Sequence, residues 1–138
     1  MTVAHLGIRL DTKRTAETVD ITTRVAEQVG AANVRDGICV VTVEHTTAGV
    51  FVNENADPDV QLDLLVALER LVPDHNDYRH AEGNSPAHLK AVLVGSNITV
   101  PVREGALVLG RWQGIYFAEF DGPRTRHLRV TVIGDAAG

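Results

Sequence analysis

The sequence predicts an α+β fold in which largely antiparallel β-sheets, or a β-sandwich, pack with two or three helices. Segments with the alternation or β-branched composition of strands outnumber segments with helical periodicity. The strand segments come in runs with helices inserted between them, which favours α+β over alternating α/β. The chain has 138 residues, of which 44% are hydrophobic and 22% charged, so we expect residues 1–138 to form a single domain.

The first half of the chain contains three expected strands and one short helix. Residues 6–10 alternate as in a half-buried strand, and β-branched runs predict strands over 37–43 and 50–52. Between the first two strands, Asp20 has the position of a helix cap. Apolar residues follow it at every fourth position, and Gly30 marks the expected helix end.

The second half begins with the strongest helix signal in the sequence, an aspartate cap followed by proline and a leucine-rich face over residues 57–71. A polar loop over 73–84 follows, and Ser85 before a proline predicts the cap of another helix that ends near Gly95. The remaining segments are four strands and a frayed tail, expected over 98–102, 106–112, 115–120, 128–133 and 135–138.

Composition excludes several classes of protein. The chain carries 13 Lys and Arg against 18 Asp and Glu, a net charge of −5, which argues against general nucleic-acid binding. No apolar stretch has a membrane-spanning length, and the first residues lack the pattern of a signal peptide. The sequence therefore predicts a cytoplasmic protein with neither nucleic-acid nor membrane partners.

Two single-copy residues are expected to be structural. Cys39 is the only cysteine, so the chain has no internal disulfide and no cysteine-rich metal site. It lies in an apolar run and is predicted to be a small buried hydrophobe. Trp112 is the only tryptophan, and packing in the core is the favoured interpretation over stacking on a ligand.

Histidines suggest the first candidate chemistry. His80 and His88 bracket a Gly-Asn-Ser-Pro turn, and His45 follows the most apolar strand. Three imidazoles that leave one coordination position open match a catalytic zinc-type site, and one imidazole is suited to proton transfer near neutral pH. The alternative is that each histidine caps a loop or hydrogen-bonds a backbone carbonyl.

A second group of residues suggests binding of a phosphate-like anion. Ser85 begins a helix whose first amides have no intrahelical partner, and Asn84 precedes it. Thr46, Thr47 and Arg124 add hydroxyl and guanidinium donors. The alternative is that Ser85 is an ordinary helix cap.

Three carboxylates flank the histidines in sequence. Glu54 and Glu82 are candidates to orient an imidazole, bind a divalent cation or act as a base. Asp57 has a sufficient structural explanation as a helix cap.

Five motifs occur in order along the chain: HTTAG (45–49), NENADP (53–58), HAEGNSPAHLK (80–90), GRWQGI (110–115) and EFDGPR (119–124). Together they resemble the YjbQ family, also named the secondary thiamine-phosphate synthase family, over roughly Leu6 to Ile133. The resemblance implies a homotrimer of compact subunits in which β-sheets pack with a few helices. It also implies a polar pocket near a subunit boundary that binds a metal or phosphate-like anions, formed by His45, His80, His88, Asn53, Glu54 and Asn84.

The family name implies an activity that joins a pyrimidine diphosphate to a thiazole phosphate and releases pyrophosphate. A divalent metal ion (zinc or similar), Arg124 and the helix start at Ser85 would stabilise the leaving group. His80 or His88 would transfer a proton, and Glu54 or Glu82 would hold metal or orient a histidine. The alternatives are a hydrolase or transferase acting on another small phosphorylated metabolite, and a non-catalytic module that binds a metal or metabolite.

Overall fold

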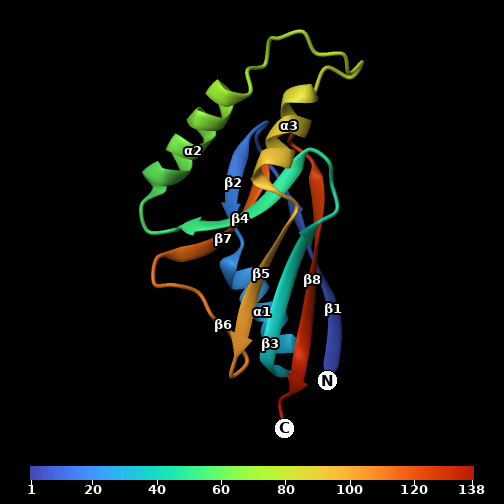
Figure 1. Cartoon of the computed structure of the whole chain (residues 1–138), viewed down its shortest axis with the longest axis vertical. Coiled ribbons are helices and arrows are strands. Elements are labelled where there is room, and N and C mark those ends of the chain that lie inside the picture. The colour runs from blue at the N-terminus through green and yellow to red at the C-terminus, as the bar shows by residue number, and fades with distance from the viewer.

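Two antiparallel sheets form the body of the protein in the computed structural model, which describes residues 1–138 (Figure 1). The larger sheet has the order β1-β8-β3-β5-β6 and the smaller β2-β7-β4. The larger sheet comprises β1 (Thr2–Asp11), β3 (Val34–Val43), β5 (Asn97–Arg103), β6 (Ala106–Leu107) and β8 (Thr125–Ala136). The smaller comprises β2 (Glu17–Asp20), β4 (Ala48–Glu54) and β7 (Gln113–Glu119). Three helices, α1 (Thr22–Ala31), α2 (Pro58–Leu71) and α3 (Ser85–Val94), complete an α+β fold, as predicted.

The main core is built from the inward rows of the strands and from one face of α1. On β3 the side chains of Cys39 and Val41 are fully buried, and on β8 those of Val130 and Val132 are also fully buried. Val25 of α1 joins the same cluster of 19 buried residues. Because successive strand residues face opposite sides of a sheet, every second position of these strands enters the core.

Burial confirms the prediction for Cys39, which is 0% exposed. Burial also raises the pKa of its thiol to about 11, so the thiol stays protonated at neutral pH. Trp112 contradicts its prediction. It is 55% exposed and lies under the guanidinium of Arg111, 4.7 Å from the ring centroid, because the turn before β7 faces away from the core.

Several predicted strands have different lengths in the structure. Strand β2 was not predicted, and β4 continues to Glu54, beyond the predicted end at Val52. Strand β6 contains only two residues, and within the rest of the predicted strand Gly110 N donates to Gln113 Oε1 at 2.7 Å in a turn. The expected tail is instead the end of β8, where residues up to Ala136 pair with β3. Backbone pairing therefore extends this strand beyond its apolar residues.

The predicted helix caps agree in part with the structure. Asp57 caps α2 as predicted, with its side chain accepting from Asp59 N at 2.9 Å. Asp20 lies one residue before the N-cap of α1 and accepts from Thr22 N at 2.9 Å. Ser85 is not a cap, because the N-cap of α3 is Asn84, whose side chain makes no capping bond. The Asn84 amide is instead committed to a tertiary contact described below.

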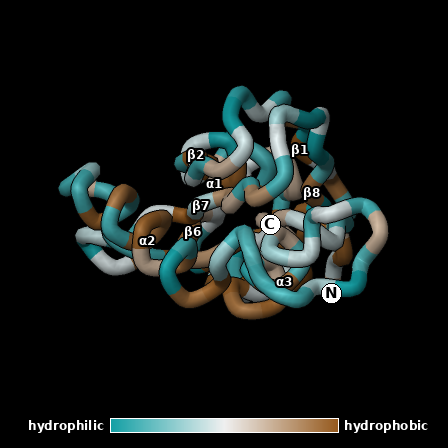
Figure 2. The backbone as a smooth tube through the Cα atoms, turned by 90° about the horizontal axis from the view of Figure 1, so that it is seen from above, coloured by the Kyte–Doolittle hydropathy of each residue, from teal (hydrophilic) through white to brown (hydrophobic).

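Helices α2 and α3 leave apolar side chains at the surface. The predicted apolar face of α2 is at most half-buried and its Leu71 is exposed, while Gln61 is its one buried residue. On α3, the small residues Ala87 and Ala91 pack against the smaller sheet. Figure 2 shows hydrophobic residues on α2 at one edge of the molecule. The exposed apolar residues of both helices are Leu62, Val66, Leu71, Leu89, Val92 and Leu93.

None of the helices combines the length and the apolar character needed to cross a membrane.

Candidate functional site

A wholly polar pocket of about 430 Å³ lies where the β3–β4 connection, the start of α3 and the β7–β8 connection meet. Strand register brings these segments together, because Ala48 of β4 pairs with Glu119 of β7 and Phe120 N donates to Thr47 O at 3.2 Å. None of its lining residues is hydrophobic: Glu44, His45, Thr46, Thr47, His80, Glu82, Asn84, His88, Asp121, Arg124 and Arg126. All three predicted histidines therefore line one pocket.

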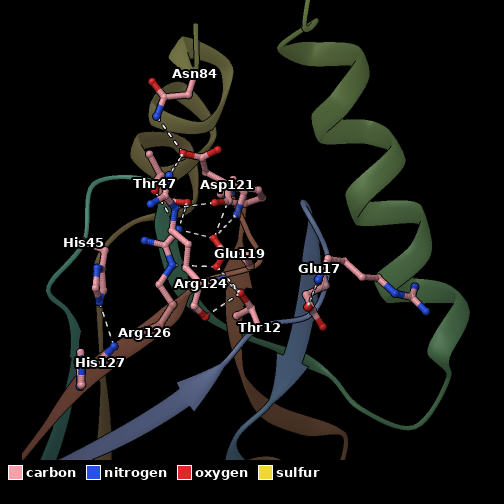
Figure 3. A network of polar contacts seen from close by, with 12 residues as sticks. Thr12, Glu17, His45, Thr47, Asn84, Glu119, Asp121, Arg124, Arg126 and His127 are labelled. Carbon is pink, nitrogen blue, oxygen red and sulfur yellow. Dashed lines mark hydrogen bonds and ion pairs between the residues drawn. The ribbon is translucent and has the colours of Figure 1, made fainter. Parts of the chain in front are cut away.

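His45 is held as a neutral imidazole. Its Nε2 accepts a hydrogen bond from His127 N at 2.9 Å (Figure 3), so the ring proton resides on Nδ1. Burial lowers the pKa of His45, and the positive charge of Arg126 lowers it further, against smaller opposing effects of Glu119 and Glu44. His45 therefore offers an N–H donor rather than a positive charge.

His80 and His88 form a close pair at the start of α3. Their rings meet edge to face, with centroids 5.1 Å apart. Glu82 lies beside the pair, with its Oε2 3.9 Å from His80 Nε2. A carboxylate next to an imidazole can help to orient the ring. This arrangement provides two imidazoles for proton transfer at one side of the pocket.

Asp121 links the start of α3 to the β7–β8 connection. Its Oδ2 accepts from Asn84 Nδ2 at 2.9 Å and from Arg124 Nη2 at 3.0 Å. Burial acts to raise the pKa of Asp121, but these hydrogen bonds and the charges of Arg124 and Arg126 outweigh it and lower the pKa. Asn84 Oδ1 is buried without a protein partner. Two residues predicted to contact an anion, Asn84 and Arg124, are therefore joined by one carboxylate.

Beneath the pocket lies a buried ion pair between Glu119 and Arg126 (Figure 3). Glu119 accepts from Arg126 Nε at 2.8 Å, from Arg126 Nη2, and from Thr12 Oγ1 at 2.7 Å. It also accepts from the backbone N–H groups of Phe120 and Asp121. Burial acts to raise the pKa of Glu119, but these hydrogen bonds outweigh it and lower the pKa, so Glu119 is ionised at neutral pH.

Three predicted site residues lie outside this pocket. Ser85 lines a neighbouring hollow together with His80 and His88. Asn53 and Glu54 lie at the far end of β4, about 17 and 20 Å along the strand from Ala48 at roughly 3.3 Å per residue. There the Glu54 carbonyl accepts from Gln61 of α2 at 3.2 Å. Within one chain the structure therefore does not bring Asn53 and Glu54 to the histidines.

The residues do not form the predicted three-histidine metal centre within this chain. The structure contains no group of three His, Cys, Asp or Glu side chains placed to hold a metal ion. His80 and His88 supply two neighbouring imidazoles, whereas Nε2 of His45 already accepts the His127 N–H. A catalytic zinc site requires three protein donors, and this chain alone brings only two imidazoles together with their nitrogens free of protein hydrogen bonds.

Comparison with known proteins identifies the family. A family model described as UPF0047 protein YjbQ-like matches residues 7–135. The chain belongs to the YjbQ/UPF0047 family. It is 47% identical over 127 residues to a UPF0047 protein of Methanocaldococcus jannaschii, with 92% of each chain covered. It is 43% identical over 128 residues to YugU of Bacillus subtilis, covering 92% of this chain and 97% of that relative.

Solved structures support the family assignment. A YjbQ/UPF0047 family protein of Clostridium acetobutylicum has a TM-score of 0.91 at 49% identity, covering 93% of this chain and 99% of that one. A YbjQ-like protein of Sulfolobus solfataricus has a TM-score of 0.93 at 36% identity, covering 96% and 98%. The fold of this YjbQ-family chain is therefore that of its relatives.

Arg126, Asp121 and Glu44 line the pocket but were not among the predicted site residues, and Glu119 beneath it had no predicted role. Arg126 shares the two-residue register of Leu128, Val130 and Val132, so it occupies the inward row of β8. An arginine in such a row is rarely buried without a partner. This charge in an inward-facing row was the available signal, but the predicted strand began at residue 128 and so left Arg126 outside it.

Proposed function

We propose that this YjbQ-family protein is an enzyme that binds a small phosphorylated metabolite in the histidine pocket and cleaves or transfers a group next to its phosphate. The observation that carries the proposal is the lining of the pocket. It combines the edge-to-face pair His80 and His88 with the guanidinium groups of Arg124 and Arg126, and it contains no hydrophobic residue. Proton transfer and stabilisation of an anionic leaving group need these two kinds of side chain.

Each group has a distinct proposed role. His80 or His88 protonates the departing oxygen, with Glu82 orienting the ring of His80. Arg124 contacts the phosphate, and its guanidinium is kept in place by Asp121. Thr46 and Thr47 line the same pocket and are available as hydroxyl donors. Ser85 lies beside the histidine pair and is available to the distal part of a substrate.

The specific reaction we propose to test first is the one suggested by the family resemblance. The ring nitrogen of a thiazole phosphate would attack the methylene carbon of a pyrimidine diphosphate. A C–N bond forms, the C–O bond to pyrophosphate breaks, and its electron pair leaves with the pyrophosphate. The pocket would accelerate this step by stabilising the departing anion with Arg124 and by donating a proton from the histidine pair.

The experiment measures pyrophosphate release and thiamine phosphate formation by the purified protein from the two substrates. A panel of other phosphorylated metabolites is assayed in parallel for phosphate or group transfer. Turnover of the thiamine precursors supports the specific reaction, and turnover of another panel member supports the broader enzyme class alone. Tight binding without turnover across the panel would instead support a non-catalytic module and contradict the proposal.

A divalent metal ion, zinc or a similar ion, remains a prediction for this pocket. It is tested by elemental analysis of protein purified without chelators, compared with a variant in which His80 and His88 are both alanine. Stoichiometric metal that is lost in the variant would support the ion. Equal metal content in the two proteins would contradict it.

We also propose that the protein assembles as a homotrimer with the pocket near a subunit boundary. The exposed apolar residues of α2 and α3 support this assembly, because burying them between subunits would remove apolar surface from water. In such a trimer, Asn53 and Glu54 of one subunit would lie near the histidine pocket of the next subunit. Analytical ultracentrifugation should give three times the 14.9 kDa chain mass, and a monomer would contradict the proposal.

A further inference from the structure

The guanidinium of Arg126 is buried and held at two of its three nitrogens. The side chain is 3% exposed. Nε and Nη2 both donate to the carboxylate of Glu119, and Nη2 also donates to Thr47 Oγ1 at 2.9 Å. The guanidinium therefore has one orientation, fixed from below by a carboxylate and from one side by a hydroxyl group.

The third nitrogen, Nη1, makes no hydrogen bond with the protein, although Arg126 is one of the residues that line the histidine pocket. Nη1 is also absent from the few polar atoms that are sealed inside the protein without a partner, which are Gln61 Oε1 and Asn84 Oδ1. It therefore reaches the pocket with two N–H donors available. A donor at the open edge of an otherwise buried guanidinium, with no protein acceptor, indicates a place for an acceptor supplied from outside the chain.

Two neighbouring groups have donors free in the same pocket. Thr47 Oγ1 accepts from Arg126 Nη2, so the hydroxyl proton of Thr47 remains available to a ligand. Arg124 donates through Nε and Nη2 to Asp121, which leaves its own Nη1 without a protein partner. The positive charges of Arg124 and Arg126 are both partly offset by carboxylates, yet each retains a nitrogen edge for hydrogen bonding.

We infer that Arg126 is the principal oxyanion-binding residue of the pocket, and that its Nη1 and the Thr47 hydroxyl donate to the oxygens of one phosphoryl group. Arg124 contacts the same group from the more exposed side. This assignment rests on the proposed function and names the residues that recognise the phosphate. It places the phosphate over the Glu119–Arg126 pair rather than at the helix start, since Ser85 lies outside this pocket and the following proline has no N–H.

Inorganic phosphate is the probe for the test. Phosphate is titrated into the intact protein at constant ionic strength and followed by ¹H–¹⁵N NMR, including the arginine side-chain signals. In wild type, the Arg126 signal should shift with the amides of the β3–β4 connection. Arg126→Lys keeps the charge but loses the fixed Nη1 donor, so phosphate affinity should fall about tenfold or more, as expected for a hydrogen bond to a charged group.

Arg9→Lys provides the matched control. Arg9 is an exposed arginine of β1 that pairs with Asp11 and does not line the histidine pocket, so this variant makes the same substitution away from the phosphate site. Its phosphate affinity should stay within about twofold of wild type. If Arg126→Lys does not fold, Thr47→Val and Thr47→Ser take its place. The valine variant should bind phosphate more weakly, and the serine variant, which keeps the hydroxyl, should bind like wild type.

Phosphate binding that is unchanged in Arg126→Lys or in Thr47→Val would overturn the inference, as would a wild-type protein that phosphate does not shift. These outcomes are separable from failure of the proposed function. Turnover of a phosphorylated substrate with the same KM in wild type and Arg126→Lys would reject the inference and keep the enzyme. Arg126-dependent phosphate binding without turnover of any phosphorylated metabolite would keep the inference and reject the enzyme.

Discussion

Removing Arg126 should destabilise the protein strongly, because it leaves the Glu119 carboxylate charged and buried. Glu119 is 0% exposed and accepts five hydrogen bonds, two of them from Arg126. Removing one partner of a buried pair costs about 3–5 kcal/mol. The Thr12 hydroxyl and two backbone N–H groups remain in Arg126→Met, so we expect a cost near the lower end, about 3 kcal/mol.

The assay compares the urea denaturation of four proteins at pH 7 and at one fixed protein concentration: wild type, Arg126→Met, Glu119→Gln and the double variant. The double variant no longer buries an unpaired charge. Its loss in free energy of unfolding should therefore be about 2 kcal/mol smaller than the sum of the losses in the two single variants. A loss below about 1 kcal/mol in Arg126→Met, or additivity within about 0.5 kcal/mol, would refute the reasoning.

Three further predictions test other parts of the structure. Gly37→Ala should impair folding, because its added Cβ would lie 1.9 Å from the Ile133 carbonyl oxygen, whereas Gly30→Ala, with open space, should stabilise α1 by about 0.5–1 kcal/mol; thermal denaturation compares them. Because the pKa of Glu119 is lowered in the folded protein, its ionised carboxylate stabilises the fold above pH 4.5, and this stabilisation is lost as the pH falls below that value. In denaturation experiments the free energy of unfolding of wild type should therefore fall at acid pH, and Glu119→Gln should lack this part of the fall. Imidazole ¹⁵N NMR should show His45 protonated on Nδ1 with a pKa below 6.5, and an Nε2–H tautomer would contradict this.

Local patterns predicted most of the fold. The cap and proline at residues 57–58 correctly placed the start of α2, and β-branched runs located the centres of β3 and β5. Strand ends were less predictable because hydrogen bonding to neighbouring strands decides them. The last residues of β8 are polar or small, yet they pair with β3, which no local pattern specifies.

The candidate site was predictable only where polar residues clustered in sequence. His45, His80 and His88 do line one pocket, as expected from their loop contexts. Glu54 was grouped with them because it lies close to His45 in sequence. The intervening residues form an extended strand that carries it away from the pocket. Sequence proximity is thus a poor guide to spatial proximity when a strand separates the residues.

The buried parts of the site depended on tertiary structure. Asparagine is a common helix cap, but the side-chain amide of Asn84 donates instead to Asp121 in a distant part of the chain. Likewise, the tautomer of His45 depends on the backbone of His127, which is adjacent only after β3 and β8 pair. Contacts of this kind determine which ring nitrogen or oxygen faces a ligand, and residue spacing alone does not reveal them.

The most direct test of the histidine pocket as a catalytic site is the kcat of His88→Ala with the best phosphorylated substrate. His75→Ala, in the exposed loop before the pocket, is the control. Loss of a proton-transfer group should reduce kcat by about 10²–10⁴-fold in His88→Ala while phosphate affinity is retained, and His75→Ala should match wild type. A wild-type kcat in all three variants, His88→Ala, His80→Ala and the double variant, would contradict a catalytic role for the histidine pair.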